Sequence, residues 1–181
     1  MTRTIEIVDY DPAWPDAFAG ISQAVAAALG PLALRIEHVG STAVPGLGAK
    51  PIIDIDVVIE SPRLLPRVVE ALSALGYIHE GDGGIPGREA FGREGAAVPA
   101  DGSGREWPDH HLYVCPGDSE ELRRHLRFRD YLRSHPEAAA RYEALKRDLA
   151  ERHPNDIDSY VQGKSAFVER ILAVDGGDAR G

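Results

Sequence analysis

Apolar residues recur along this 181-residue chain with two spacings, and each spacing predicts one kind of element. Apolar positions three or four residues apart mark one face of a helix, whereas alternation or a β-branched run marks a strand. Helical spacing predicts helices over residues 14–29, 62–75, 119–133, 136–152 and 156–174. The strand patterns cover residues 5–8, 34–39, 51–59, 77–80, 90–93 and 110–115. We therefore predict an α/β (α+β) protein with a small mixed sheet and flanking helices.

The chain changes character after residue 117, where strand patterns stop and helical patterns take over. We predict a sheet-containing core over residues 1–117 and a C-terminal helical segment over 118–175 that packs on it as one structural unit. Residues 176–181 are polar and glycine-rich, which predicts a flexible tail. Residues 94–108 carry little periodic apolar signal, and we expect a mobile loop there.

Two acids share one face of the most apolar predicted strand. Alternation places Asp54 and Asp56 on one side, while Ile53, Ile55 and Val57 face the core. Neighbouring carboxylates repel each other and lose hydration on burial, so a cation that holds both is favoured. Oxygen ligands suit Mg²⁺ or Mn²⁺. The alternative is that one acid caps a loop or pairs with an arginine.

A glycine-rich connection precedes this strand and begins with Gly40, Ser41 and Thr42. Backbone N–H groups in such a turn, together with the serine hydroxyl, can bind nucleotide phosphates. Lys50 stands before Pro51, which favours an extended backbone, and its ammonium group could approach a phosphate or remain in solvent. The alternative is that the glycines serve only the turn geometry.

His111 lies on the predicted strand 110–115, on the same face as Tyr113. Imidazole exchanges protons near neutral pH, so His111 is a candidate general base or metal ligand. A histidine satisfied by a nearby carboxylate or carbonyl is the structural alternative. Asp109 shares its face and could supply a further acid, whereas His110 on the opposite face is expected to pack in the core.

Basic side chains for binding phosphate are expected outside the acidic strand. Arg129 falls on one helical stripe with His125 and Arg133. Lys164, or Lys146 in its place, is a candidate contact for a triphosphate. Arg88 follows a glycine-rich loop and could reach a substrate from a mobile lid. The alternative for each is a solvated side chain paired with an acid.

The order of these motifs resembles the DNA-polymerase-β-like nucleotidyltransferase superfamily, in which a Gly-Ser turn precedes an acidic pair on the next strand. The chain resembles the GrpB (UPF0157) family more narrowly, from about Val8 to Leu172. The segments that carry this resemblance are Tyr10-Asp11-Pro12-Ala13-Trp14-Pro15, Glu37-His38-Val39-Gly40-Ser41-Thr42-Ala43-Val44-Pro45-Gly46-Leu47, Ala49-Lys50-Pro51-Ile52-Ile53-Asp54-Ile55, His110-His111-Leu112-Tyr113-Val114, His125-Leu126-Arg127-Phe128-Arg129-Asp130-Tyr131-Leu132-Arg133 and Tyr160-x-x-x-Lys164-x-x-Phe167.

The resemblance implies a nucleotidyltransferase core and an Mg²⁺-dependent transfer of a nucleoside monophosphate from an NTP to a small-molecule acceptor. Asp54 and Asp56 would bind the metal, while Gly40 and Ser41 would bind the phosphates. Lys164, Arg129 and Arg88 would neutralise the leaving pyrophosphate. Active superfamily members usually have a third carboxylate on a neighbouring strand, and none is evident in this sequence.

Charge and composition narrow the remaining classes. The formal net charge of -9 disfavours a broad contact with nucleic acid. A single cysteine, Cys115, excludes an intramolecular disulfide framework, and we expect it to be inert. No apolar run has bilayer length and the first residues lack a signal-peptide core, so we expect a cytoplasmic protein without a membrane partner. The sequence carries no signal for an oligomeric state.

Two other functions remain open at this stage. One is a non-catalytic nucleotide-binding or chaperone-like module that supports a partner such as a coenzyme A-pathway kinase, because GrpB relatives occur fused to dephospho-coenzyme A kinase. The other is a hydrolase or phosphotransferase that uses the same acids to activate water.

Overall fold

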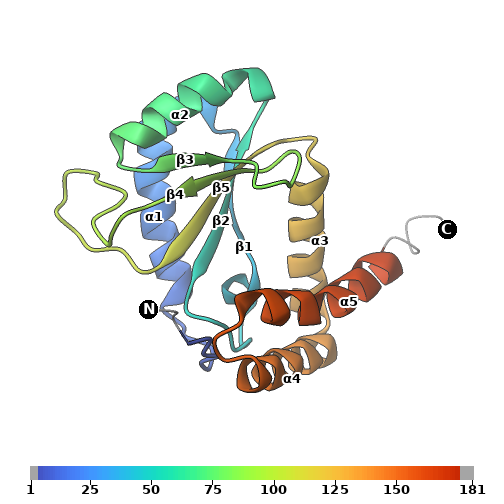
Figure 1. Cartoon of the computed structure of the whole chain (residues 1–181). Helices are drawn as coiled ribbons and strands as arrows, with labels where there is room; N and C mark the ends of the chain where they lie inside the picture. The colour runs from blue at the N-terminus through green and yellow to red at the C-terminus, as the bar shows by residue number, and fades with distance from the viewer. Residues whose placement is uncertain (1–3, 176–181) are drawn as a thin grey trace. The chain divides into compact units, whose positions relative to one another are not determined.

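A computed structural model describes residues 4–175 of the chain (Figure 1). Their contacts divide them into two compact units. The sheet unit comprises Ala13–Val39 and Ile52–Arg123, and the helical unit comprises residues 4–12, Gly40–Pro51 and residues 124–175. In this grouping the glycine-rich connection belongs with the C-terminal helices. The predicted flexible tail lies outside the described residues.

The sheet unit contains one mixed sheet, which among the described residues has five strands. The strands are β1 (Arg35–Val39), β2 (Ile53–Ile59), β3 (Ile78–Gly81), β4 (Glu89–Gly92) and β5 (His110–Pro116). Their order across the sheet is β1-β2-β5-β4-β3, and only the central β2–β5 pair within it is parallel. The predicted mixed α/β fold is confirmed, and β2 and β5 form the middle of the sheet.

Two helices cover one face of this sheet. Helix α1 (Trp14–Leu29) packs against β1, β2 and α2 (Leu65–Ala74), and in Figure 1 it passes behind the strands. Ile21, Val25 and Leu29 recur every fourth residue on α1 and are buried. The apolar side chains of β2 face the helices, which leaves the polar side of the strand on the opposite face of the sheet.

The helical unit contains most of α3 (Glu120–Ser134), α4 (Pro136–Arg152) and α5 (Ile157–Asp175). Its core joins the glycine-rich connection to these helices, because Val44 and Leu47 pack in one cluster with Tyr142 and Phe167. The Tyr142 and Phe167 rings stack with centroids 5.1 Å apart. Between residues 4 and 175, no helix combines the length and apolar character that crossing a bilayer requires.

The predicted strand over residues 5–8 is wrong. Val8 forms only an isolated antiparallel bridge with Ala49, and Ile5 donates its N–H to the carbonyl of Pro154 at 2.7 Å. Ile5 and Ile7 are buried in a second cluster with Leu149, Ala150 and Tyr160. The alternation that predicted a strand therefore serves packing on α4 and α5, and no ladder forms.

Candidate functional site

The acidic pair lies on the sheet face opposite α1 and α2. Ile55 and Val57 are fully buried on the helix side of β2, so alternation directs Asp54 and Asp56 to the other side. Asp56 is 0% exposed, whereas the side chain of Asp54 is 31% exposed. One carboxylate is thus enclosed and its neighbour is open to solvent.

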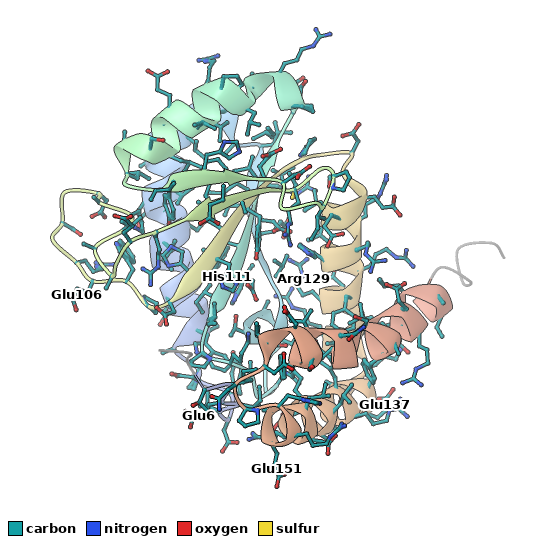
Figure 2. The ribbon with its side chains drawn as sticks, viewed as in Figure 1. Glu6, Glu106, His111, Arg129, Glu137 and Glu151 are labelled. Carbon is teal, nitrogen blue, oxygen red and sulfur yellow. The ribbon has the colours of Figure 1, made fainter. Side chains whose placement is uncertain are left out.

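The register of the parallel β2–β5 pair brings His111 beside Asp54 and Tyr113 beside Asp56. Nδ1 of His111, a residue labelled in Figure 2, lies 2.9 Å from Oδ1 of Asp54. If Nδ1 carries the proton, the carboxylate accepts that hydrogen bond and Nε2 keeps a lone pair. The side chain of His111 is 49% exposed, so Nε2 can meet a ligand.

Sequence reasoning missed Glu37, which stands opposite Asp56 in the antiparallel β1–β2 pair. Opposed residues of an antiparallel pair share a face, and like charges in these positions destabilise a sheet. Arg35 lies on the same face and its Nε is 3.0 Å from Glu37 Oε1. Only the register reveals this carboxylate, because alternation within one strand does not identify the partner across the ladder.

Glu80 is a second missed acid. It lies where the β3–β4 register shifts between His79 and Gly81, and its carboxylate occupies the space beside Gly92. A Cβ on Gly92 would stand 2.1 Å from Oε1 of Glu80. Glycine at this position therefore leaves room for the Glu80 carboxylate beside β4. We call Glu37, Asp54, Asp56 and Glu80 the acidic face.

Arg88 and Tyr113 lie on the β4 side of this face. The Arg88 guanidinium carbon is 4.4 Å from the centroid of the Tyr113 ring. Burial, followed by the charges of Asp54 and Asp56, raises the pKa of Tyr113 to about 12, and Arg88 opposes that rise. The phenol is therefore protonated at neutral pH, and Arg88 is the cation that stands against the carboxylates at this edge.

The Gly-Ser turn belongs to the helical unit. Gly40 has φ 73° and ψ -173°, a conformation that is essentially restricted to glycine, and Ser41–Ala43 form a 3₁₀ turn. The Ser41 side chain is half-buried, whereas Thr42 is only 1% exposed. A ligand would therefore reach Thr42, a predicted phosphate contact, through its backbone and not through its hydroxyl.

The ammonium group of Lys146 donates hydrogen bonds to the glycine-rich connection. Its Nζ donates to Ser41 Oγ at 2.9 Å and to the carbonyl of Gly48 at 2.5 Å, and the side chain is buried. Burial is the main cause that lowers the pKa of Lys146 to about 7, and Lys164, Arg147 and Lys50 act in the same direction. The sequence offered Lys146 only as an alternative to Lys164, because nothing in α4 or α5 indicates which of the two lysines turns inward.

Lys50 and Lys164 lie over the ring of Tyr160, with Nζ 5.4 Å and 4.5 Å from its centroid. We call Lys50, Lys146 and Lys164 the lysine cluster. Arg129, the other predicted phosphate contact in this unit, has Nε 2.8 Å from Asp130 Oδ1. Arg133, its neighbour on the predicted stripe, donates from Nε to the carbonyl of Ala43 at 2.9 Å. The structure therefore brings the predicted lysines together and gives Arg129 an acidic neighbour.

Two residues take the structural roles expected of them. His110 is buried, with Nε2 2.7 Å from the Tyr77 hydroxyl and Nδ1 2.9 Å from the Pro108 carbonyl. Burial lowers the pKa of His110 to about 4, so its ring is neutral. Burial also raises the pKa of Cys115 to about 12, which keeps this buried thiol protonated.

The donor set suits a hard cation that takes part of its coordination from a substrate. Within residues 4–175, no group of three or more His, Cys, Asp or Glu side chains is arranged to hold a metal ion. Mg²⁺ is commonly bound by one or two carboxylates, with phosphates and water completing the octahedron. Two carboxylates on one strand, with Glu37 opposite, fit that mode of binding.

This chain is similar in sequence to a known protein family. The family model described as "GrpB protein" matches residues 4–174. The UPF0157 protein PA4798 of Pseudomonas aeruginosa is 44% identical over 169 residues, which are 93% of this chain and 66% of that protein. UPF0157 protein YqkA of Bacillus subtilis is 35% identical over 92% of this chain and 46% of its own length. The chain therefore spans about half to two thirds of these relatives.

A dephospho-CoA kinase of Mycolicibacterium paratuberculosis is 33% identical over 90% of this chain, which corresponds to 44% of that protein. Among solved structures, GrpB from Enterococcus faecalis has a TM-score of 0.80 at 34% identity, covering 94% of this chain and 96% of its own. Cid1 poly(U) polymerase bound to MgATP has a TM-score of 0.54 at 13% identity, covering 81% and 45%. The last likeness is one of fold.

Proposed function

Because the chain belongs to the GrpB family and has the nucleotidyltransferase fold, we propose that it transfers a nucleoside monophosphate from an NTP to a small-molecule acceptor with the help of Mg²⁺ or Mn²⁺. The observation that carries this proposal is the pairing across β2 and β5. It places two carboxylates on one face and hydrogen-bonds one of them to His111. The metal-binding carboxylates and the general base would thus lie on two adjacent strands.

Asp54 and Asp56 are the residues that would hold the metal. Bound there, the cation would neutralise charge that develops on the α-phosphate and on the attacking oxygen. The enclosed Asp56 fixes one ligand in place, and the partly exposed Asp54 is the one that His111 orients. Glu37 adds negative charge opposite Asp56, which strengthens the preference for a cation.

The nucleotide phosphates would bind at the turn of Gly40, Ser41 and Thr42. Gly40 follows directly after Val39, the last residue of β1. The lysine cluster supplies the positive charge that a polyphosphate requires. Arg129 would contribute once its side chain exchanged Asp130 for phosphate.

His111 would act as the general base. Asp54 accepts the Nδ1 hydrogen bond and thereby fixes the ring, and Nε2 would take the proton from the acceptor hydroxyl or amine. Proton transfer by a positioned histidine supplies the role that a third carboxylate has in other enzymes of this superfamily.

A thermal-shift panel tests the proposal. The four NTPs should stabilise the protein in the presence of Mg²⁺, and Asp54→Ala with Asp56→Ala should abolish the metal-dependent part. Glu106→Gln, which removes an exposed carboxyl group labelled in Figure 2, is the matched control and should respond as the wild type does. The absence of any nucleotide or metal response would refute the proposal.

Transfer itself needs a second assay. The protein is incubated with Mg²⁺, an NTP labelled on the α-phosphate and a metabolite extract. We expect a new labelled product and release of pyrophosphate, both lost in Asp56→Asn. Labelled water entering the product would instead identify a hydrolase.

A second candidate function is a non-catalytic module that supports a kinase of the coenzyme A pathway. The observation in its favour is the dephospho-CoA kinase relative, in which the matched region is 44% of the protein. In that case, adding this chain should raise the activity or stability of a separately purified dephospho-CoA kinase domain. The Asp54→Ala, Asp56→Ala variant would support the kinase equally well, which separates this function from catalysis.

A further inference from the structure

Arg88 has hydrogen-bonding capacity that the fold does not use. Its Nε is buried and has no hydrogen-bond partner among the described residues. The guanidinium lies on the face of the Tyr113 ring. This cation–π contact stabilises the positive charge, but the ring gives the Nε–H group no hydrogen-bond acceptor. A buried donor without a partner costs free energy, so its persistence at a candidate site suggests a ligand that supplies the acceptor.

The backbone around Arg88 is held firmly within the sheet unit. The Gly87 carbonyl accepts a 2.7 Å hydrogen bond from Ser119 Oγ, and Arg88 donates its N–H to the Ile85 carbonyl at 3.3 Å. Gly87 has φ 77°, and a Cβ there would stand 3.0 Å from Ser119 Oγ. These bonds connect the loop that carries Arg88 to helix α3 and to its own turn, which favours a positioned guanidinium before a ligand arrives.

The order of strands places Arg88 at one particular side of the acids. Strand β1 lies at one edge of the sheet, whereas Arg88 immediately precedes β4, beyond β5. Asp54, Asp56 and His111 lie on the strands between. In an in-line transfer the incoming acceptor and the leaving pyrophosphate lie on opposite sides of the reacting phosphorus. We assign the acceptor to the β4 side, where Arg88 lies.

We propose that Arg88, stacked on Tyr113, binds an oxyanion carried by the acceptor, either a phosphate or a carboxylate. An anionic acceptor approaching the acidic face would be repelled by Asp54, Asp56 and Glu80, and the fixed guanidinium offsets that repulsion. A guanidinium group offers parallel pairs of N–H donors, the arrangement that planar or tetrahedral oxyanions accept in bidentate fashion. The identity of the ligand as the acceptor rests on the proposed function, whereas the oxyanion site can be tested without it.

Binding is measured by NMR on the full chain, in buffer with a chelator and without nucleotide. The ring resonances of Tyr113 report the site while inorganic phosphate or acetate is added. We expect saturable shifts with a millimolar dissociation constant. Arg88→Gln should weaken binding at least about tenfold, and Arg88→Lys, which keeps the charge and loses the fork, should fall between.

Arg105→Gln is the matched control, because Arg105 makes the corresponding contact with Trp107, its guanidinium carbon 4.9 Å from the ring centroid, in the same unit. It should bind as the wild type does. Shifts with phosphate alone identify a phosphorylated acceptor, and equal shifts with acetate identify a carboxylate. The proposal is overturned if the Tyr113 resonances do not respond, or if Arg88→Gln binds like the wild type.

This experiment separates the two proposals. If the wild-type protein binds the oxyanion but shows no transfer activity, the proposed nucleotidyltransferase function is refuted and the oxyanion site stands. If nucleotide binds in a metal-dependent way but the Tyr113 resonances do not respond to an oxyanion, the oxyanion site is refuted and the proposed function stands.

Discussion

The acidic face and the lysine cluster bury charge in opposite ways. On the sheet, Asp56 is enclosed with other carboxylates around it, and the local charge attracts a cation. In the helical unit, Lys146 is enclosed with Lys164, Lys50 and Arg147 nearby, and the local charge attracts an anion. Each region alone carries an unfavourable excess of one sign. A cation would relieve the first excess, and an anion the second.

The two regions also differ in what holds them. Backbone ladders fix the carboxylates, since alternation and register decide their neighbours. The environment of Lys146 is built from three separate stretches of chain. Lys146 itself lies on α4, its Nζ donates to Ser41 and Gly48 of the glycine-rich connection, and Lys164 lies on α5. A change at Asp54, Asp56 or His111 should therefore alter chemistry with little effect on folding, whereas a change at the lysine cluster should affect both.

The largest expected effect comes from Asp56→Asn. It keeps the shape of the side chain and removes the charge that would hold the metal. We expect transfer to fall by about 10³-fold, as when a preorganised electrostatic contact is lost. Radiolabel transfer measures the rate, and circular dichroism checks the fold. Activity that equals that of the Glu106→Gln control would break the comparison, because the acidic face would then be structural.

Adjacent histidines on β5 give the next test. His111→Gln should lower transfer by at least about 10²-fold and leave stability nearly unchanged, because the side chain is half exposed. His110→Leu should instead lower the free energy of unfolding by about 1–3 kcal/mol, since it leaves the Tyr77 hydroxyl and the Pro108 carbonyl without their partner. Urea unfolding and transfer assays on both variants should show this exchange of effects. Equal loss of activity in both would contradict it.

Gly40→Ala tests the turn. An alanine at φ 73° and ψ -173° should destabilise the protein by about 1–3 kcal/mol. We also expect weaker binding of inorganic pyrophosphate, because relief of the strain would shift Ser41. Denaturant unfolding and calorimetric titration measure the two quantities. An unchanged stability would mean that the turn tolerates a side chain, and the geometric argument for the phosphate site would lose its basis.

Lys146→Met should give the smallest effect, and one that depends on pH. The pKa of Lys146 is about 7 in the folded protein and 10.5 ordinarily, so between these values the unfolded chain binds more protons. Wild-type stability should therefore rise with pH relative to Lys146→Met, by at most about 1.4 kcal/mol per pH unit. Urea unfolding at successive pH values within this window measures the slope. A difference independent of pH would show that Lys146 stays charged when buried.

Much of the fold follows from local pattern. Residues 14–29 and 136–152 form helices with the predicted bounds, because a proline in the first turn and the apolar spacing agree there. The strand predicted over residues 5–8 is wrong, because alternation also suits an extended segment that packs on helices. In the site, Asp54, Asp56 and His111 could be predicted because strand alternation assigns a face without knowledge of the partners.

The sequence by itself determined the acidic pair, the glycine that permits the turn at Gly40, and membership of the GrpB family. Tertiary structure alone decided which groups meet them. Register selected Glu37 and paired Asp54 with His111, a bulge and a glycine admitted Glu80, and the packing of α4 turned Lys146 inward. The physical reason is that backbone periodicity acts over a few residues, whereas these contacts join segments as far apart as Ser41 and Lys146.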